Sequence, residues 1–345
     1  MKFLSSLLLT MLPLGAAADS IPERKLPEWF PTVSGTLRAK GEYQTEEGEG
    51  RFEVRNARIA LDGNITPALL YRAEVDLSDE GRIRMLDAYA GMNFSKGWLV
   101  RLGQMRVPFS IDAHRSPHKQ YFANRSFIAK QVGDVRDVGL SVAWDVPGLP
   151  LKLEGGLFNG SGLTNQKDYW TKEVNFSAKA QYYPVKGLTL QGSVQKISPA
   201  GCNVMLYDGG ITWDRGGWLL EAEYLRKHYE DNAFSAVNAL DLMAGYEFSL
   251  HPRGVLGRRA ELNGLRLLVR YDRMDDHSDG SVDDNGSLAL TDAARQRLTG
   301  GVTLCFGHKL QAQLRLNYEK YFYESGAVAK TSERDKAVME LMVHF

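Results

Sequence analysis

The amino-acid sequence predicts an all-β fold, a 16-stranded antiparallel transmembrane β-barrel over residues 32–345. Three observations indicate this fold. Hydrophobic residues recur at every second position, short and long connections alternate along the chain, and the last strand ends on Phe345. A closed sheet fits these features because, unlike an open sheet, it pairs every backbone N–H and C=O group in hydrocarbon.

The first 31 residues precede the barrel. Residues 1–18 are typical of a secretory signal peptide, because Lys2 supplies a positive charge, Phe3–Leu14 is apolar and Ala16–Ala18 forms a cleavage site. The apolar stretch is too short to span a bilayer, and a buried first helix is the alternative. Residues 19–31 form a Pro-rich periplasmic lead. We therefore expect an exported protein.

The alternating pattern is regular enough to place the strands. The clearest case sets Leu310, Ala312, Leu314, Leu316 and Tyr318 against Gln311, Gln313, Arg315 and Asn317. The sixteen predicted strands cover 32–43, 51–61, 68–78, 83–94, 97–106, 137–145, 150–158, 173–183, 187–197, 203–213, 217–228, 239–249, 264–273, 295–305, 308–319 and 335–345. In the second strand Phe52 and Val54 are out of phase with Ile59 and Leu61, which predicts a β-bulge between them.

The connections carry independent information. Those after even-numbered strands are mostly tight, as at Asp214–Gly216, whereas those after odd-numbered strands are often long, as at Val107–Arg136 and Met274–Ala294. Ser198–Cys202 and Leu250–Asn263 break the rule. Bacterial outer-membrane barrels sort their connections in this way, with short periplasmic turns and long external loops.

The last predicted strand adds evidence on location. Ala337, Met339, Leu341, Val343 and Phe345 share one face. An alternating terminal strand that ends in Phe resembles the signal read by the outer-membrane insertion machinery. Together with the signal peptide it predicts the bacterial outer membrane. A soluble periplasmic β protein is the alternative, and extraction without detergent would favour it.

The composition excludes several classes of protein. The 345 residues include 42 Lys+Arg and 42 Asp+Glu, so no basic surplus is present for binding nucleic acid. The mean hydropathy of −0.31 does not exclude a barrel, since it averages a lipid face with a lumen face. Two cysteines exclude a disulfide scaffold. Cys202 is expected in an external loop and Cys305 beside the periplasmic turn at Gly307, which predicts two free thiols.

Four motifs then resemble the phosphate-selective porin O/P family. In family order they are RLGQMRVPFS at Arg101–Ser110, RDVGL at Arg136–Leu140, GGLFNG at Gly155–Gly160 and RYD at Arg270–Asp272. The resemblance covers nearly the whole mature chain. It implies a trimeric outer-membrane barrel whose third external loop folds into the pore. It also implies a channel in which phosphate or polyphosphate passes arginines and lysines that line the pore.

The third external loop of that family corresponds to Val107–Arg136 here. Its permanent cations are Arg115, Lys119, Arg125, Lys130 and Arg136, against Asp112 and Asp134. Cations at a constriction lower the barrier for anions, so charge reversal at the first three cations is expected to reduce anion selectivity. A solvated loop without a role in permeation is the alternative.

The predicted lumen face carries both signs of charge. Its basic residues are Arg38, Lys40, Arg72, Arg101, Lys179, Arg266, Arg270, Arg295, Arg297 and Arg315. Its acidic residues are Glu42, Glu74, Asp76, Asp87, Glu221, Glu223, Asp241, Glu247 and Glu340. This near balance favours paired charges over an uninterrupted basic path and argues against strict phosphate specificity.

No catalytic or nucleotide-binding motif is present in the chain. His114 and His118 are spaced as a metal pair but lack evident further ligands. One loop carries Asp275, Asp276, Asp279, Asp283 and Asp284, which we interpret as a solvated acidic loop, with a Ca²⁺ site as the alternative because such oxygens would suit that ion; we predict no metal site. We predict no catalytic residue and no cofactor.

The sequence therefore predicts an outer-membrane diffusion porin with anion preference, with phosphate or polyphosphate as candidate solutes. The expected partners are small anions, outer-membrane lipid, lipopolysaccharide and two further copies of the chain. A general non-selective porin and an outer-membrane hydrolase built on a barrel are the alternatives.

Overall fold

The computed structural model describes residues 30–345 except 80, 96, 132–135, 164–165, 200–201, 251–260, 285 and 308–310, and except the side chains of Lys130 and Gln131. The predicted signal peptide lies outside the described residues. So does the predicted Pro-rich lead, apart from Phe30 and Pro31.

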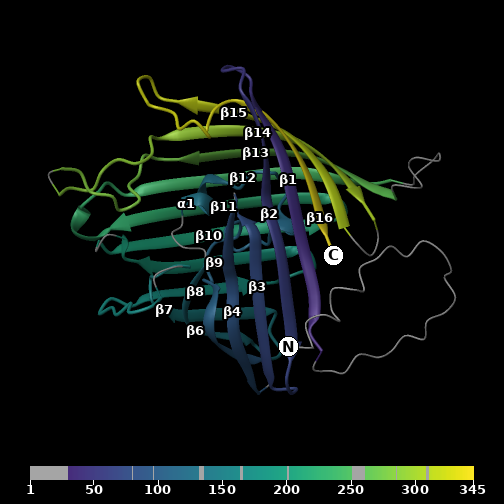
Figure 1. Ribbon diagram of the computed structural model, residues 1–345, viewed down its shortest axis with the longest axis vertical. Coiled ribbons are helices and arrows are strands. Elements are labelled where there is room, and N and C mark those ends of the chain that lie inside the picture. The colour runs from purple at the N-terminus through teal and green to yellow at the C-terminus, as the bar shows by residue number, and fades with distance from the viewer. Residues whose placement is uncertain are drawn as a thin grey trace, which may run out of the picture.

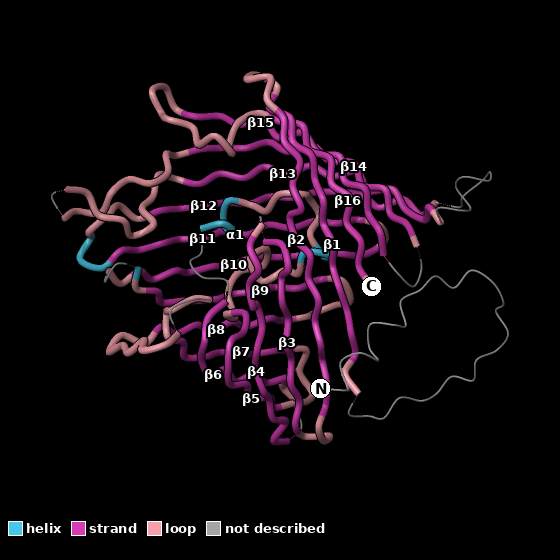
Figure 2. The backbone as a smooth tube through the Cα atoms, in the orientation of Figure 1, coloured by secondary structure: helices cyan, strands magenta, loops and turns pink. Residues whose placement is uncertain are grey.

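The described residues form one closed antiparallel barrel in which β1 pairs with β16 (Figure 1). The strands are β1 (Thr32–Gln44), β2 (Gly50–Asn64), β3 (Leu69–Asp79), β4 (Arg82–Ser95), β5 (Trp98–Arg106), β6 (Arg136–Asp145), β7 (Leu151–Phe158), β8 (Asn175–Tyr182), β9 (Leu188–Ile197), β10 (Val204–Arg215), β11 (Trp218–Tyr229), β12 (Val237–Ser249), β13 (Leu262–Met274), β14 (Arg295–Phe306), β15 (Gln311–Tyr323) and β16 (Lys336–His344). Helices are short: η1 (Pro117–Lys119), α1 (Phe127–Gln131) and η3 (Glu230–Asn232) (Figure 2).

The predicted fold class is confirmed, and the strands match the alternating runs to within a few residues. One boundary matters for function. Arg136 was predicted to close the loop after the fifth strand, but it is the first residue of β6 and pairs with Arg106 of β5. The predicted boundary was one residue short, because Arg136 is charged and does not extend the apolar alternation of the strand.

The predicted irregularity in β2 is a β-bulge at Arg55. Arg38 of β1 lies opposite Asn56, and Ala39 lies opposite Val54, so Arg55 is the extra residue at the shift in register. The extra residue restores the phase of the apolar side chains, and Val54 and Ile59 are both exposed on the outer face. The bulge therefore keeps one continuous apolar surface along β2.

The last strand closes the barrel through backbone bonds next to a glycine. Gly35 N donates to Phe345 O over 2.8 Å, and Phe345 N donates to Gly35 O over 3.1 Å. The Phe345 ring fills the space where a side chain at position 35 would lie, since a Cβ there would be 2.4 Å from the ring Cζ atom. A side chain at position 35 would therefore displace the Phe345 ring.

The two faces of the wall differ in chemistry. The outer face exposes large apolar side chains such as Leu102, Leu140 and Leu242, whereas the alternate positions are buried and mostly polar. Trp98 and Trp144 stack with ring centroids 4.8 Å apart, at the end where even-numbered strands finish. In the described part of the chain, no helix is long and apolar enough to cross a membrane.

The outer face leads to a first prediction. Leu242 lies on the exposed face near the middle of β12, opposite Ala222 and Tyr271. If this face contacts hydrocarbon, Leu242→Arg should lower the free energy of unfolding by about 2–4 kcal/mol, because a charge at the bilayer midplane is poorly solvated. Urea unfolding in lipid vesicles measures the effect, with Leu242→Ala as control. Equal stability of the two variants would contradict a lipid-facing wall.

Cys202 and Cys305 are both free thiols, in agreement with the sequence prediction. Cys202 precedes the start of β10, whereas Cys305 lies near the end of β14. Since β10 and β14 run in the same direction, the two thiols lie at opposite ends of the barrel.

Candidate functional site

The segment between β5 and β6 contacts inward-facing side chains from widely separated strands. We call residues 107–131 the interior loop. Ser177 of β8 donates to Pro108 O over 2.8 Å, whereas Arg38 of β1 donates to Ala123 O over 2.6 Å. These two strands lie far apart around the barrel. The interior loop therefore connects opposite parts of the wall.

Wall carboxylates hold the backbone N–H groups of the interior loop. Glu223 of β11 accepts from the Ser110 hydroxyl over 2.5 Å and from Ile111 N over 2.6 Å. Asp272 of β13 accepts from Phe127 N over 3.2 Å, at the start of α1. Both side chains are buried, so these hydrogen bonds stabilise one position of the loop.

Wall arginines hold the carbonyls of the same loop. Arg270 donates to Asn124 O over 3.1 Å and Arg297 donates to Arg125 O over 2.7 Å. The guanidinium carbon of Arg297 also lies 4.7 Å from the centre of the Phe127 ring. These arginines thus position the loop, although the sequence placed them on an anion path.

Apolar contacts complete the attachment of the loop. Six of its buried apolar side chains belong to one cluster: Val107, Phe109, Ala113, Phe127, Ile128 and Ala129. They form one cluster with inward-facing residues of the wall, among them Val204, Leu206, Leu225 and Val237. Apolar residues facing a water-filled lumen would be unfavourable, so the loop covers this part of the wall.

The three arginines that the sequence placed in this loop lie next to carboxylate or carbonyl oxygens. Arg115 contacts Glu221 and lies 3.3 Å from Asp112. Arg136, now part of β6, lies 2.7 Å from Asp87. Arg125 donates to loop carbonyls, including Arg115 O over 2.8 Å. All three guanidinium groups therefore have oxygen partners within the protein.

The two predicted loop lysines differ from the arginines. Lys119 ends η1 and is exposed, and no ion pair joins it to another described residue. Lys130 lies in α1, but its side chain lies outside the described residues. Of the described cations in the interior loop, Lys119 is therefore the one most open to a permeating ion.

Asp112 organises the inside of the interior loop. It accepts from Ser126 N over 2.9 Å and from the Ser126 hydroxyl over 3.0 Å. Burial alone would raise the pKa of Asp112, but the charges of Arg125 and Arg115 outweigh it and lower the pKa to about 2. The carboxylate therefore stays ionised, and the loop keeps this internal bond, at any pH in the physiological range.

The predicted wall cations are also mostly paired. Nine of the ten lie within 4.0 Å of a described carboxylate: Arg38, Lys40, Arg72, Arg101, Arg266, Arg270, Arg295, Arg297 and Arg315. The wall thus carries pairs of opposite charges, as the near balance of its sequence indicated. Such pairs present much less net charge to a passing ion than isolated cations would.

Lys179 of β8 is the tenth wall cation. It is 5% exposed, and no described carboxylate lies within 4.0 Å of its ammonium group. Its cross-strand neighbour Glu154 instead contacts Arg101. Lys179 lines a cavity of about 220 Å³ together with His114 and Gln191. The side-chain N–H₂ group of Gln191 is also buried without a partner, so two donors remain open at this cavity.

His118 introduces a pH dependence. Its ring stacks on that of His344 with centroids 3.8 Å apart, and burial together with His344 and Lys119 lowers the pKa of His118 to about 4. The ring is neutral at pH 7 and gains a positive charge as the pH falls towards 3. If the barrel conducts ions, its permeability to anions relative to cations should therefore rise more in the wild type than in His118→Asn over this range. Reversal potentials at pH 7 and pH 3 measure it, and identical shifts in both proteins would contradict the assignment.

The predicted acidic loop does not assemble a metal site in the described part of the chain. Asp275 accepts from Asn238 N over 3.0 Å, and Asp279 and Asp283 accept from serine groups of the same loop. Asp276 and Asp284 are exposed. The described residues bring together no group of three or more His, Cys, Asp or Glu side chains that could hold a metal ion.

Sequence reasoning missed the residues that hold the interior loop. Glu223 and Asp272 lie on predicted strands of the barrel, but the interior-loop residues that donate to them are more than one hundred residues away in the sequence. One signal was available: Val204, Leu206 and Leu225 are apolar at positions that face inward. In a wide barrel such residues indicate that a loop covers them.

Comparisons with known proteins agree with this architecture. The family profile of phosphate-selective porin O and P matches residues 34–209. OmpF of Salmonella typhi, in complex with daunomycin, aligns with a TM-score of 0.64 at 14% identity, covering 92% of this chain and 98% of that one. An anion-selective porin from Comamonas acidovorans aligns with a TM-score of 0.61 at 11% identity, covering 91% and 98%. OmpT of Vibrio cholerae, in its trimer form, aligns with a TM-score of 0.59 at 10% identity, also covering 91% and 98%.

At these identities the likeness to the solved structures shows the fold alone. No curated protein matches the chain.

Proposed function

Because the chain belongs to the phosphate-selective porin O and P family, we propose that it is an outer-membrane diffusion porin with a mild preference for anions. One observation carries the preference. Lys179 faces inward beside a cavity of about 220 Å³ without a described carboxylate within 4.0 Å, whereas the other predicted wall cations are paired. A cation without a carboxylate in direct contact attracts anions and repels cations, and no catalytic step is needed.

We assign the constriction to the interior loop. Its bonds to Ser177, Glu223 and Arg297 on three different strands support a loop that folds inward across the lumen. Lys119 in this loop would add to the field of Lys179, because it is exposed and carries no ion pair to a described residue. The remaining space beside the loop would form the pore.

A general non-selective porin is the second candidate. The observation that favours it is the pairing of nine of the ten predicted wall cations. The two candidates differ in the sign and size of the reversal potential under a salt gradient. A mild anion preference gives a small potential of fixed sign, whereas a non-selective pore gives a value near zero in KCl.

Phosphate and polyphosphate are the solutes to test against chloride. Strong phosphate binding would need several cations free to converge on one anion, but Arg115, Arg270 and Arg297 already contact carboxylates. We therefore expect inorganic phosphate at millimolar concentration to leave the chloride current nearly unchanged. Saturable block at micromolar phosphate would overturn the mild preference in favour of a phosphate-selective channel.

Three further features belong to the same proposal. The mature chain would begin at Asp19 after removal of residues 1–18, and N-terminal sequencing of protein from outer membranes tests this. The porin would be a homotrimer surrounded by lipid and lipopolysaccharide, which crosslinking in native membranes tests. Esterase and protease assays on the purified trimer test the alternative of a hydrolase, and we expect no activity.

A further inference from the structure

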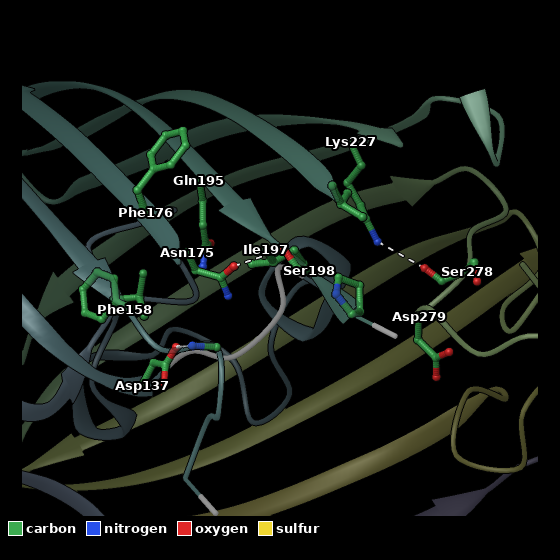
Figure 3. Close-up of a pocket in the computed structure, with 14 residues that line it drawn as sticks. Asp137, Phe158, Asn175, Phe176, Gln195, Ile197, Ser198, Lys227, Ser278 and Asp279 are labelled. Atoms are coloured by element: carbon green, nitrogen blue, oxygen red, sulfur yellow. Dashed lines mark hydrogen bonds between the residues drawn. The ribbon is translucent and has the colours of Figure 1, made fainter. Parts of the chain in front are cut away.

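A second cavity lies at the end of the barrel where the odd-numbered strands finish. Its volume is about 330 Å³, within the range of small-molecule sites. Inward-facing residues at the ends of β6 to β11 line it, together with the loop that follows β13 (Figure 3). It is distinct from the cavity beside Lys179 and shares no lining residue with it.

A buried and poorly partnered cation stands on one side of this cavity. Lys227 of β11 is only 4% exposed. Its ammonium group lies 3.5 Å from Ser278 O, at the outer limit for a hydrogen bond, and 5.4 Å from the centre of the Tyr229 ring. No described carboxylate lies within 4.0 Å of it. An ammonium group has three N–H donors, so at least two remain available to an anionic group in the cavity.

Carboxylates also line the cavity. In Figure 3, Asp137 lies on the side opposite Lys227, and Asp279 lies below Lys227. Asp137 is buried. Its Oδ1 atom accepts from Val138 N, Gly162 N and the Ser161 hydroxyl, whereas its Oδ2 atom accepts from Gly160 N over 2.6 Å, which leaves a lone pair on Oδ2 for another donor. An anionic ligand without a positive group would be repelled by the two carboxylates. A cationic ligand without a negative group would be repelled by Lys227.

Neutral groups complete the lining. Gln195 is buried, and its amide forms no hydrogen bond with another described side chain. Phe158 and Val204 supply apolar surface between the charged sides. The cavity thus offers a donor for a carboxylate, an acceptor for an ammonium group and an apolar contact for a side chain.

We propose that this cavity binds a small zwitterion of the α-amino acid class. Its carboxylate would contact the Lys227 ammonium group, its ammonium group would contact Asp137, and its side chain would pack on Phe158 and Val204. The inference goes beyond the proposed porin function, because it assigns equilibrium binding at the entrance rather than passage through the constriction. No covalent step is involved.

Equilibrium dialysis of the detergent-solubilised protein tests the site, with radiolabelled L-leucine as the probe. Two competitors keep the leucine carbon skeleton: 4-methylpentanoate lacks the ammonium group, and 3-methylbutylamine lacks the carboxylate. We expect leucine to bind saturably and each competitor to bind at least tenfold more weakly. Equal binding of either competitor, or no saturable leucine binding, would overturn the proposal.

Variants locate the site. Lys227→Met should weaken leucine binding at least tenfold, and Lys227→Arg should restore most of it by keeping the charge. Lys196→Met is the matched control, because Lys196 lies on β9, whose residues Gln195 and Ile197 also line the cavity, but pairs with Glu173 instead. Unchanged binding in Lys227→Met would contradict the assignment. Because the assay needs no conduction, absence of channel activity would count against the porin proposal and not against this site.

Discussion

Replacing Arg297 by methionine is expected to lower the free energy of unfolding by about 3 kcal/mol, because it removes the buried guanidinium group that two buried carboxylates share. Arg297 is 0% exposed. Its guanidinium group lies 2.8 Å from Asp272 and 3.4 Å from Glu319, and it also holds the carbonyl of Arg125 in the interior loop. The variant should therefore lose both wall stability and one attachment of the loop.

Urea unfolding in detergent, followed by tryptophan fluorescence, measures this loss. Arg266→Met is the matched control, since Arg266 pairs with Glu247 at a more exposed position and should cost no more than about 1 kcal/mol. Arg297→Lys should be intermediate, because lysine keeps the charge but not the planar fork of donors. If Arg297→Met and Arg266→Met unfold at the same urea concentration, Arg297 contributes no more to stability than Arg266, which would contradict this prediction.

Reversing the charge at Lys179 should convert the mild anion preference into a cation preference. Two units of charge acting over about 7 Å in water change the energy of a monovalent ion by about 1 kcal/mol before screening by salt. The effects on chloride and potassium are opposite. Screening at about 0.1 M salt roughly halves each effect over this distance, so the ratio of chloride to potassium permeability should fall roughly tenfold in Lys179→Glu.

Reversal potentials in planar bilayers measure this change. Lys196→Glu is the control, because Lys196 points away from the lumen on the neighbouring strand β9 and pairs with Glu173. A second variant, Lys119→Glu, should shift the ratio in the same direction if the interior loop forms the constriction. If Lys179→Glu and the control give the same reversal potential, Lys179 does not lie on the permeation path.

The barrel could be predicted from the sequence because the pattern that indicates each strand lies within that strand. Alternation places each strand, and even the bulge at Arg55 was visible as a change of phase between Val54 and Ile59. Cross-strand charge pairs between sequential neighbours are nearly as accessible, as with Arg266 opposite Glu247. In a barrel of sequential strands, local patterns therefore determine most of the wall.

The candidate site depends on contacts that the local pattern does not contain. Ser110 and Glu223 are separated by 113 residues in the sequence. Their hydrogen bond forms only because the interior loop, which follows β5, reaches β11. Arg270 and Arg297 have lumen-facing positions, as predicted, but their donors are directed at loop carbonyls and carboxylates. A count of inward cations overestimates the charge that an ion meets, because pairing neutralises most of them.

The most direct test of this account is the reversal potential of the wild-type protein in a planar bilayer under a KCl gradient at pH 7. A porin whose inward charges are mostly paired, with Lys179 and Lys119 in excess, should give open channels and a small potential of the sign that indicates chloride preference. A potential that indicates potassium preference, or a bilayer without channels, would contradict the account.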